Sequence, residues 1–366
     1  MKKWIALGLT VLLLLGSGLA VAVAQHWPSR RLQAVNLSYI KPEWKVNWSL
    51  PPGDLKELDQ VRQEAIGVWT PAWPEHYYQY RVDFEYPDAI ETLYVSWDHQ
   101  VYCPIEEKLY PDLGTALVPY LEAMDASFFG TPLDWSTVSQ LWPRKTKALV
   151  TDLDTQKSFW MFRWGGNLHA DVEPVTREDA ATMKEIYGDY TWRRRAVIVE
   201  VQGHRIAGSL HSMPHGGGDI RGNDFPGHCC LHFNGSTTHG TRKEDPAHGL
   251  MLKKAAGLWW HTLREADAAI WAHHFLTLMA QRDFSTLNFL MVEDEQDRIR
   301  KLALQLSSMR IAEVSVAREG LTQADVVAAI TVYLDGDWNP HELEARLRLE
   351  HNPLTQVWQL VDFSGW

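Results

Sequence analysis

The residues best suited to nucleophilic chemistry gather in one glycine-rich stretch, residues 214–246. Cys230 lies within it, and His215 precedes Cys230 across a run of glycines. A cysteine attacks a carbonyl carbon as its thiolate, and an imidazole beside it lowers the thiol pKa and then serves as proton donor. Because glycines let the intervening chain fold back, we predict that Cys230 is a nucleophile and His215 is its acid–base partner.

Other residues near Cys230 are candidates for binding the substrate. Glycines allow backbone N–H groups to approach an oxyanion, and we expect the amides of residues 227–230 to stabilise one. His228 falls on the same face as Cys230 if the segment is extended, whereas Cys229 then points the opposite way. The candidates for oxyanion or substrate binding are Gly216, Gly227, Cys229, His232 and His169.

Two further interpretations of these residues stay open. The cysteine mechanism needs no cofactor, but zinc is an alternative, because a His228-x-Cys230-x-His232 strand could present three ligands on one face of a peptidase or amidase site. A free cysteine is also commonly a small buried core residue, which would leave a noncatalytic binding or scaffold protein. The residues that could supply zinc ligands are His169, Asp171, His211, His215, His228, Cys229, Cys230, His232 and His239.

Local patterns predict a mostly β domain around this stretch. Alternating segments at residues 148–153 and 158–164 indicate one hairpin, and segments 196–201 and 205–213 indicate a second. Thr176-Arg177-Glu178-Asp179 has the pattern of a capping box and predicts a helix that runs to about residue 187. These elements must position the histidines and cysteines of the glycine-rich stretch.

The glycine-rich stretch contains the motif His215-Gly216, followed by Gly227-His228-Cys229-Cys230-Leu231-His232. This motif resembles the signature of the L,D-transpeptidases, the YkuD-type catalytic domain, which is His-Gly, a glycine-rich gap, then Ser/Thr-His-Gly-Cys, an apolar residue, and Asn or Arg. The resemblance implies a β-rich fold and a cysteine acyl-enzyme that acts on peptidoglycan stem peptides. It implies Cys230 as the nucleophile, His215 as the acid–base partner and His228 as a structural or orienting histidine of the catalytic site. Departures are Gly227 at a Ser/Thr position, Cys229 at a glycine position and His232 at the last polar position.

The N-terminus predicts export from the cytoplasm. Residues 1–24 combine a short positive start with a long uncharged run that ends in Ala22-Val23-Ala24, so we expect a signal peptide or an uncleaved membrane anchor. The only cysteines are Cys103, Cys229 and Cys230, and an exported protein that used disulfides as staples would normally show an even, spaced set. We therefore expect an extracytoplasmic cell-envelope protein with at least one free thiol.

The whole chain is predicted to be an α+β multidomain protein. We divide it into a proline-rich tether (25–54), a small α+β module (55–144), the L,D-transpeptidase-like domain (145–257) and a C-terminal α+β module (258–366). In the last module, helices at 267–281 and 295–306 precede four strand-like segments, at 311–318, 326–334, 345–350 and 356–363. This order resembles the curved-sheet cone of nuclear-transport-factor-like domains.

Composition and net charge limit the classes of molecule that the protein is expected to bind. The chain carries 35 Lys and Arg against 46 Asp and Glu, a net charge of −11, so we expect no nucleic-acid partner. The 18 tryptophans suit an aromatic-rich core or a saccharide or peptide groove. The expected partners are peptidoglycan or its stem peptides, and the membrane if the N-terminal segment is retained. The function that fits best is cysteine-dependent acyl transfer or amide hydrolysis in the cell envelope.

Overall fold

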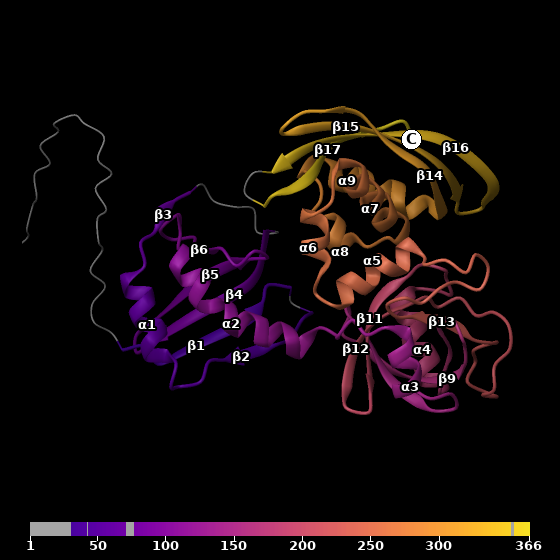
Figure 1. Cartoon of the computed structure of the whole chain (residues 1–366), viewed down its shortest axis with the longest axis horizontal. Coiled ribbons are helices and arrows are strands. Elements are labelled where there is room, and N and C mark those ends of the chain that lie inside the picture. Colours follow the sequence, from indigo (N-terminus) through magenta and orange to yellow (C-terminus); the bar gives the residue numbers. More distant parts are fainter. Residues whose placement is uncertain (1–30, 42, 71–76, 353–354) are drawn as a thin grey trace, which may run out of the picture.

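The computed structural model describes residues 31–41, 43–70, 77–352 and 355–366 (Figure 1). It shows an N-terminal α+β part, a closed β-barrel, and a C-terminal group of helices under a curved sheet. The expected signal peptide or anchor, residues 1–24, lies outside the described residues. Within the described ranges, no helix is both long and apolar enough to cross a membrane.

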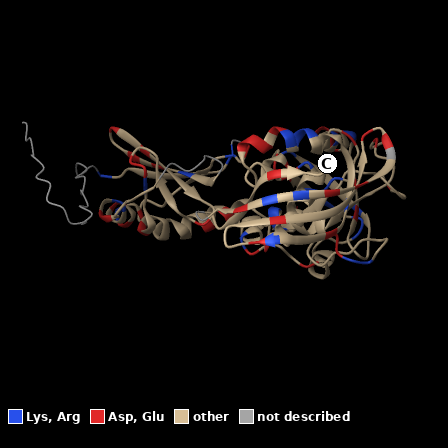
Figure 2. Ribbon diagram, turned by 90° about the horizontal axis from the view of Figure 1, so that it is seen from above, with Lys and Arg blue, Asp and Glu red and all other residues tan. Residues whose placement is uncertain are grey.

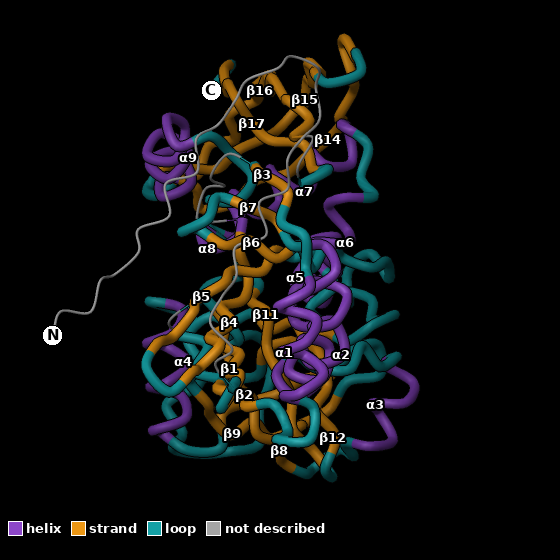
Figure 3. Tube along the Cα trace, turned by 90° about the vertical axis from the view of Figure 1, so that its left-hand side faces the viewer, coloured by secondary structure: helices purple, strands orange, loops and turns teal. Residues whose placement is uncertain are grey.

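The N-terminal part is an antiparallel sheet with two helices, and Figure 3 shows α1 (Leu55–Glu64) and α2 (Pro111–Phe128) lying side by side. The sheet begins earlier than expected. Val35 and Leu37 are fully buried on alternate positions of a strand that lies within the predicted tether. A strand can form there because the prolines of this region that the structure describes lie outside the strands. In sheet order the strands are β2 (Asn47–Ser49), β1 (Ala34–Tyr39), β4 (Tyr78–Tyr86), β5 (Ala89–Ser96), β6 (Val101–Cys103), β7 (Lys108–Leu109) and β3 (Val68–Trp69).

The central part is a closed six-stranded barrel, and both predicted hairpins form. Its interior is filled by apolar side chains from alternate positions of the strands, such as Val150, Val172 and Leu231. The strands in order around the barrel are β10 (Ala170–Pro174), β13 (Cys229–His232), β12 (His204–Leu210), β11 (Arg195–Val201), β8 (Lys147–Asp152) and β9 (Ser158–Gly165).

Three helices accompany the barrel: α3 (Trp135–Leu141), α4 (Arg177–Tyr187) and α5 (Pro246–Ala255). Helix α4 begins with the predicted capping box, in which Thr176 and Asp179 each bond the other's backbone N–H. Helix α5 starts at Pro246 after the cap Asp245 and packs on β11 and β12. It thereby covers one side of the face that carries the motif residues.

The C-terminal part places helices against a curved four-stranded meander (Figure 1). The two predicted helices and all four predicted strands are present, although the first three strands are longer than expected. The helices are α6 (Trp259–Arg264), α7 (Ala268–Gln281), α8 (Phe284–Leu287) and α9 (Glu293–Gln305), and the strands are β14 (Leu306–Glu319), β15 (Gln323–Leu334), β16 (Asp337–Asn352) and β17 (Val357–Ser364). The predicted α+β multidomain class is confirmed.

Charged residues of both signs are interspersed over the part of the chain that Figure 2 colours. Along the C-terminal strands, Arg346 pairs with Glu344 and Arg348 pairs with Asp325. The outer face of this sheet therefore carries both signs rather than one.

Candidate active site

The candidate site lies on the outward face of three neighbouring barrel strands, β10, β13 and β12. In the antiparallel register, Asp171 is opposite Cys230, and Ser209 is opposite His232. Residues directly opposite each other share a face of a sheet, and residues two apart on one strand share it as well. The strand pairing therefore brings Asp171, Cys230, His232 and Ser209 together.

Cys229 points the other way, into the barrel core. Its side chain is fully buried, and its thiol donates to the carbonyl of Val172 at 3.5 Å. The expected contact of the Cys229 side chain with substrate is therefore wrong, because alternation along β13 turns this side chain to the other face from Cys230.

The glycine-rich stretch folds back on itself beside Cys230. His215 and His228 form an antiparallel bridge, with N–H···O bonds of 2.8 and 3.0 Å in the two directions. Gly227 has a φ of +120°, and a Cβ at this position would lie 2.6 Å from the carbonyl oxygen of His215. The bridge thus requires glycine at residue 227. It holds His215 Nε2 3.3 Å from Cys230 Sγ.

The hydrogen bonds of His215 define which ring nitrogen faces the sulfur. Nδ1 lies 3.1 Å from the carbonyl oxygen of Met213, which can only accept, so we assign the proton to Nδ1. Nε2 then presents its lone pair to the Cys230 thiol. Burial lowers the pKa of His215, so the imidazole is neutral at neutral pH and able to accept a proton.

The thiol is protonated at rest. Burial raises the pKa of Cys230 to about 12, and the negative charge of Asp171 adds to this effect. This corrects the expectation of a thiol pKa lowered by an adjacent imidazole, because the neutral His215 supplies no positive charge. Attack by this sulfur would therefore require transfer of the thiol proton to His215 during the reaction, rather than a preformed thiolate.

The expected oxyanion hole is not formed by residues 227–230 in this conformation. The N–H groups of Gly227 and His228 donate to the carbonyls of Phe225 and His215, at 3.1 and 3.0 Å. The N–H of Cys230 donates to His211 Nε2 at 3.3 Å. Three of the four amides thus already have acceptors. The bond to His211 is the longest of the three.

Asp171 is the charged centre of the site. Three imidazoles present Nε2 to its Oδ1 atom, at 3.3 Å for His169, 3.9 Å for His228 and 3.2 Å for His239. Burial would raise the pKa of Asp171, but the close contact with His169 and the neighbouring imidazoles lower it. The sequence suggested Asp171 as a zinc donor or as a group that orients an imidazole. Its position opposite Cys230 was not predicted, because it depends on a strand pairing that no local pattern reveals.

His228 is held in place on both sides. Its Nδ1 lies 2.6 Å from the carbonyl oxygen of Gly217, and its ring stacks on Trp164 with centroids 5.0 Å apart. Gly216 permits this packing, because a Cβ there would lie 2.6 Å from the His228 ring. His228 thus has an orienting position, and Gly216 makes room for it.

His169 and His232 form a buried wall behind the sulfur. The ring of His232 stacks between His169, at 4.3 Å, and His248, at 3.7 Å. His169 and His232 are only 1% and 2% exposed, so the expected direct contact with substrate does not match their burial. Burial lowers the pKa of His232 and His248, which keeps this part of the wall neutral.

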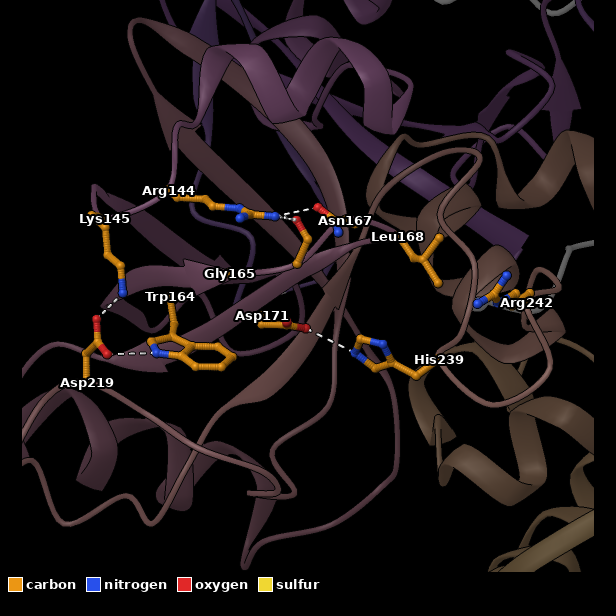
Figure 4. Close-up of a pocket in the computed structure, with 11 residues that line it drawn as sticks. Arg144, Lys145, Trp164, Gly165, Asn167, Leu168, Asp171, Asp219, His239 and Arg242 are labelled. Carbon is orange, nitrogen blue, oxygen red and sulfur yellow. Dashed lines mark hydrogen bonds and ion pairs between the residues drawn. The ribbon is translucent and has the colours of Figure 1, made fainter.

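A cavity of about 730 Å³ opens beside the site (Figure 4). Asp171 and His239 line it, and one carboxylate oxygen of Asp171 lies within 4.8 Å of the Cys230 sulfur. Arg144, Lys145 and Arg242 also line the cavity, and Lys145 is paired with the carboxylate of Asp219, which leaves Arg144 and Arg242 as cationic groups on the rim. The cavity therefore offers space for a substrate that carries carboxylates, next to a thiol that is itself only 6% exposed.

Comparison of the sequence with models of known protein families and with curated proteins gives no match. The interpretation of the site therefore depends on the geometry described above and on the motif resemblance.

Proposed function

We propose that this chain is a cysteine acyltransferase or amidase of the cell envelope that acts on peptidoglycan stem peptides. The observation that carries the proposal is the Cys230–His215 pair, with Sγ and Nε2 3.3 Å apart and Nδ1 anchored on the Met213 carbonyl. Nucleophile, base and a third group that orients the base are the arrangement required for covalent catalysis.

The reaction follows from the protonation states. His215 Nε2 takes the thiol proton while the sulfur forms a bond to the peptide carbonyl carbon. The resulting imidazolium gives this proton to the leaving nitrogen as the C–N bond breaks, which leaves a thioester on Cys230. An incoming amine or water, deprotonated by His215, then attacks the thioester and releases the thiol.

The cavity supports a carboxylate-bearing substrate. Arg144 and Arg242 lie on its rim, and a guanidinium can bind a carboxylate in a bidentate manner. Trp164 adds an aromatic wall, which Asp219 holds through a 2.8 Å bond to the indole N–H. Stem peptides combine amide bonds, which Cys230 could attack, with free carboxylates, which the arginines of the rim could bind. Together with the motif resemblance, this favours an L,D-transpeptidase-like domain, joined to a cone-like C-terminal module.

A noncatalytic wall-binding protein of the same fold is the second candidate. The observation that favours it is the burial of Cys230 together with its raised pKa of about 12, which makes the free thiol a weak nucleophile.

Intact-mass analysis after incubation with a stem tetrapeptide separates the two candidates. We expect a thioester adduct that Cys230→Ala abolishes and that His215→Gln forms about 10²–10⁴-fold more slowly, the usual contribution of a general base. His204→Gln is the matched control, because His204 is an exposed residue of β12. Co-sedimentation with cell-wall sacculi without any adduct, unchanged in Cys230→Ala, would instead establish the binding protein.

A further inference from the structure

Four side chains around Asp171 have the chemistry of a transition-metal site. One donor atom from each of His169, Asp171, His239 and Cys230 can be chosen so that all four lie within 4.8 Å of one another. We propose that these residues bind a divalent cation of the Zn²⁺ class, and that the bound ion masks the thiol of Cys230. Metal binding stands independently of the proposed function, whereas the regulatory consequence rests on it.

The donor distances match tetrahedral zinc. Zinc bonds to imidazole nitrogen and carboxylate oxygen measure about 2.0 Å, so two such donors at a tetrahedral angle lie about 3.3 Å apart. The distances from Asp171 Oδ1 to His169 Nε2 and His239 Nε2 are 3.3 and 3.2 Å. The Cys230 sulfur lies within 4.8 Å of a donor atom of each of the other three residues. With a Zn–S bond of about 2.3 Å these separations would be about 3.5 Å, so the sulfur completes the set with a movement of at most about 1.3 Å.

The tautomer of His169 indicates a cation between these donors. Its Nδ1 lies 2.7 Å from the carbonyl oxygen of Thr237, so Nδ1 carries the proton and Nε2 carries a lone pair. That Nε2 atom is buried and has no hydrogen-bond partner among the described residues, yet it faces a carboxylate oxygen. Two acceptors this close repel unless a positive charge lies between them. A ring N–H fixed on a carbonyl is also the usual support of a metal-binding histidine.

The donor set and the cavity fit zinc better than magnesium or calcium. Sulfur and imidazole ligands select zinc, whereas magnesium and calcium prefer oxygen alone. The His239 side chain is 52% exposed and lines the cavity, which gives an ion a route to the buried donors (Figure 4). Four protein donors would fill a tetrahedral shell and leave no open position, so the site suits zinc as a block on the thiol rather than as a catalyst.

A bound zinc ion would block nucleophilic attack by Cys230 because of the chemistry of the thiolate. A zinc ion deprotonates a coordinating thiol and engages the electron pair that would attack a carbonyl. Zinc therefore converts the site from a thiol to a metal-bound thiolate and releases the thiol proton to the solvent. Removal of the metal lets the sulfur take up a proton again.

Titration of the full-length, chelator-stripped protein with Zn²⁺ alone tests the site. We expect one ion per chain and a loss of affinity of at least tenfold in His239→Ala and Asp171→Asn. His261→Ala is the matched control, because this histidine is 70% exposed and also pairs with a carboxylate, that of Glu265. With Co²⁺ as probe, we expect a thiolate-to-metal charge-transfer band that Cys230→Ser abolishes. Circular dichroism checks that each variant is folded.

Alkylation of Cys230 with iodoacetamide tests the mask. Stoichiometric Zn²⁺ should slow the reaction at least tenfold, and a chelator should restore it. Binding that is equal in the control and in His239→Ala, or the absence of both the cobalt band and the protection, would overturn the proposal; a proton between the donors would then be the cation. If metal-free protein forms no adduct with stem peptides but zinc still binds and protects, the proposed function fails while the metal site stands.

Discussion

At the scale of single residues, the proposed nucleophile is protonated at rest, and its proposed base lies 3.3 Å from the sulfur. The Cys230 thiol is buried beside a carboxylate, so little thiolate exists at neutral pH. His215 is neutral and presents a lone pair to the thiol, which lets it remove the proton as the new bond forms. Because oxidation proceeds through the thiolate, this arrangement also slows oxidation of the sulfur.

Asp125 predicts a pH dependence of stability that is separate from the site. Burial raises its pKa to about 6, although the hydroxyls of Tyr39 and Tyr80 oppose the shift by donating to its two oxygens, each at 2.6 Å. A folded-state pKa above the unfolded value gives stability that is complete below about pH 4 and is lost as the pH rises through 6.

Asp125→Asn should therefore gain stability relative to the native chain as the pH rises from 4 to 7, by an amount on the order of 2–3 kcal/mol. The measurement is the difference in melting temperature between the two proteins as a function of pH. A difference that stays constant over this range would show that Asp125 titrates normally.

Part of the residue-level picture was accessible from sequence. The proximity of Cys230 and His215 was predicted from the glycines between them, and the opposite orientation of Cys229 follows from alternation along a strand. The position of Asp171 was not accessible, because β10 pairs with β13 across nearly sixty residues (Asp171↔Cys230) and nothing local encodes that register. The raised thiol pKa was missed for the same reason, since burial and the Asp171 charge both arise from tertiary packing.

At the scale of elements, the glycine-rich loop is the part that makes the site. Its bridge between His215 and His228 depends on Gly227, which combines a positive φ with close contact to the His215 carbonyl oxygen. Gly222 in the same loop also has a positive φ, of +83°, but a Cβ there would meet nothing within 4 Å. Both glycines therefore have a positive φ that favours glycine, but only at Gly227 would a Cβ also collide with neighbouring atoms.

Gly227→Ala should displace His215 and slow acylation of Cys230 by about 10–100-fold, as expected for a shift of about 1 Å in a reacting group. Gly222→Ala should carry a similar backbone cost of about 1–2 kcal/mol without affecting the rate. The acylation rate and the melting temperature of both variants check this. Equal rates in the two variants would show that the bridge does not position the base.

The elements themselves were predictable where their signals are local. The capping box at Thr176 marks the start of α4, and apolar spacing marks α7, because both signals lie within a few helical turns. Strand β1 was missed, because nearby prolines suggested a tether and hid the alternation of Val35 and Leu37. Strand β13 was considered only as a possible extended segment, since its four residues are too few to show a period.

At the scale of the whole molecule, a buried ion cluster joins the three parts of the chain. Asp154, in the turn after β8, accepts from Lys41 of the N-terminal part at 2.5 Å and from Lys254 of α5 at 2.9 Å. Lys254 also donates to Asp283, just before α8, at 2.8 Å. Burial lowers the pKa of Lys254, but the attraction of Asp154 and Asp283 outweighs this and raises it, so the lysine stays charged.

Lys254→Ala should destabilise the protein strongly, because it leaves the carboxylates of Asp154 and Asp283 buried with less compensating charge. Removal of one partner of a buried ion pair costs about 3–5 kcal/mol, which corresponds to a fall in melting temperature of roughly 6–20 °C for a cooperative unit of 150–250 residues. Lys253→Ala is the matched control, since Lys253 is the preceding, exposed residue of the same helix. Thermal scans by circular dichroism measure both, and a shift no larger than that of the control would mean that the cluster does not hold the parts together.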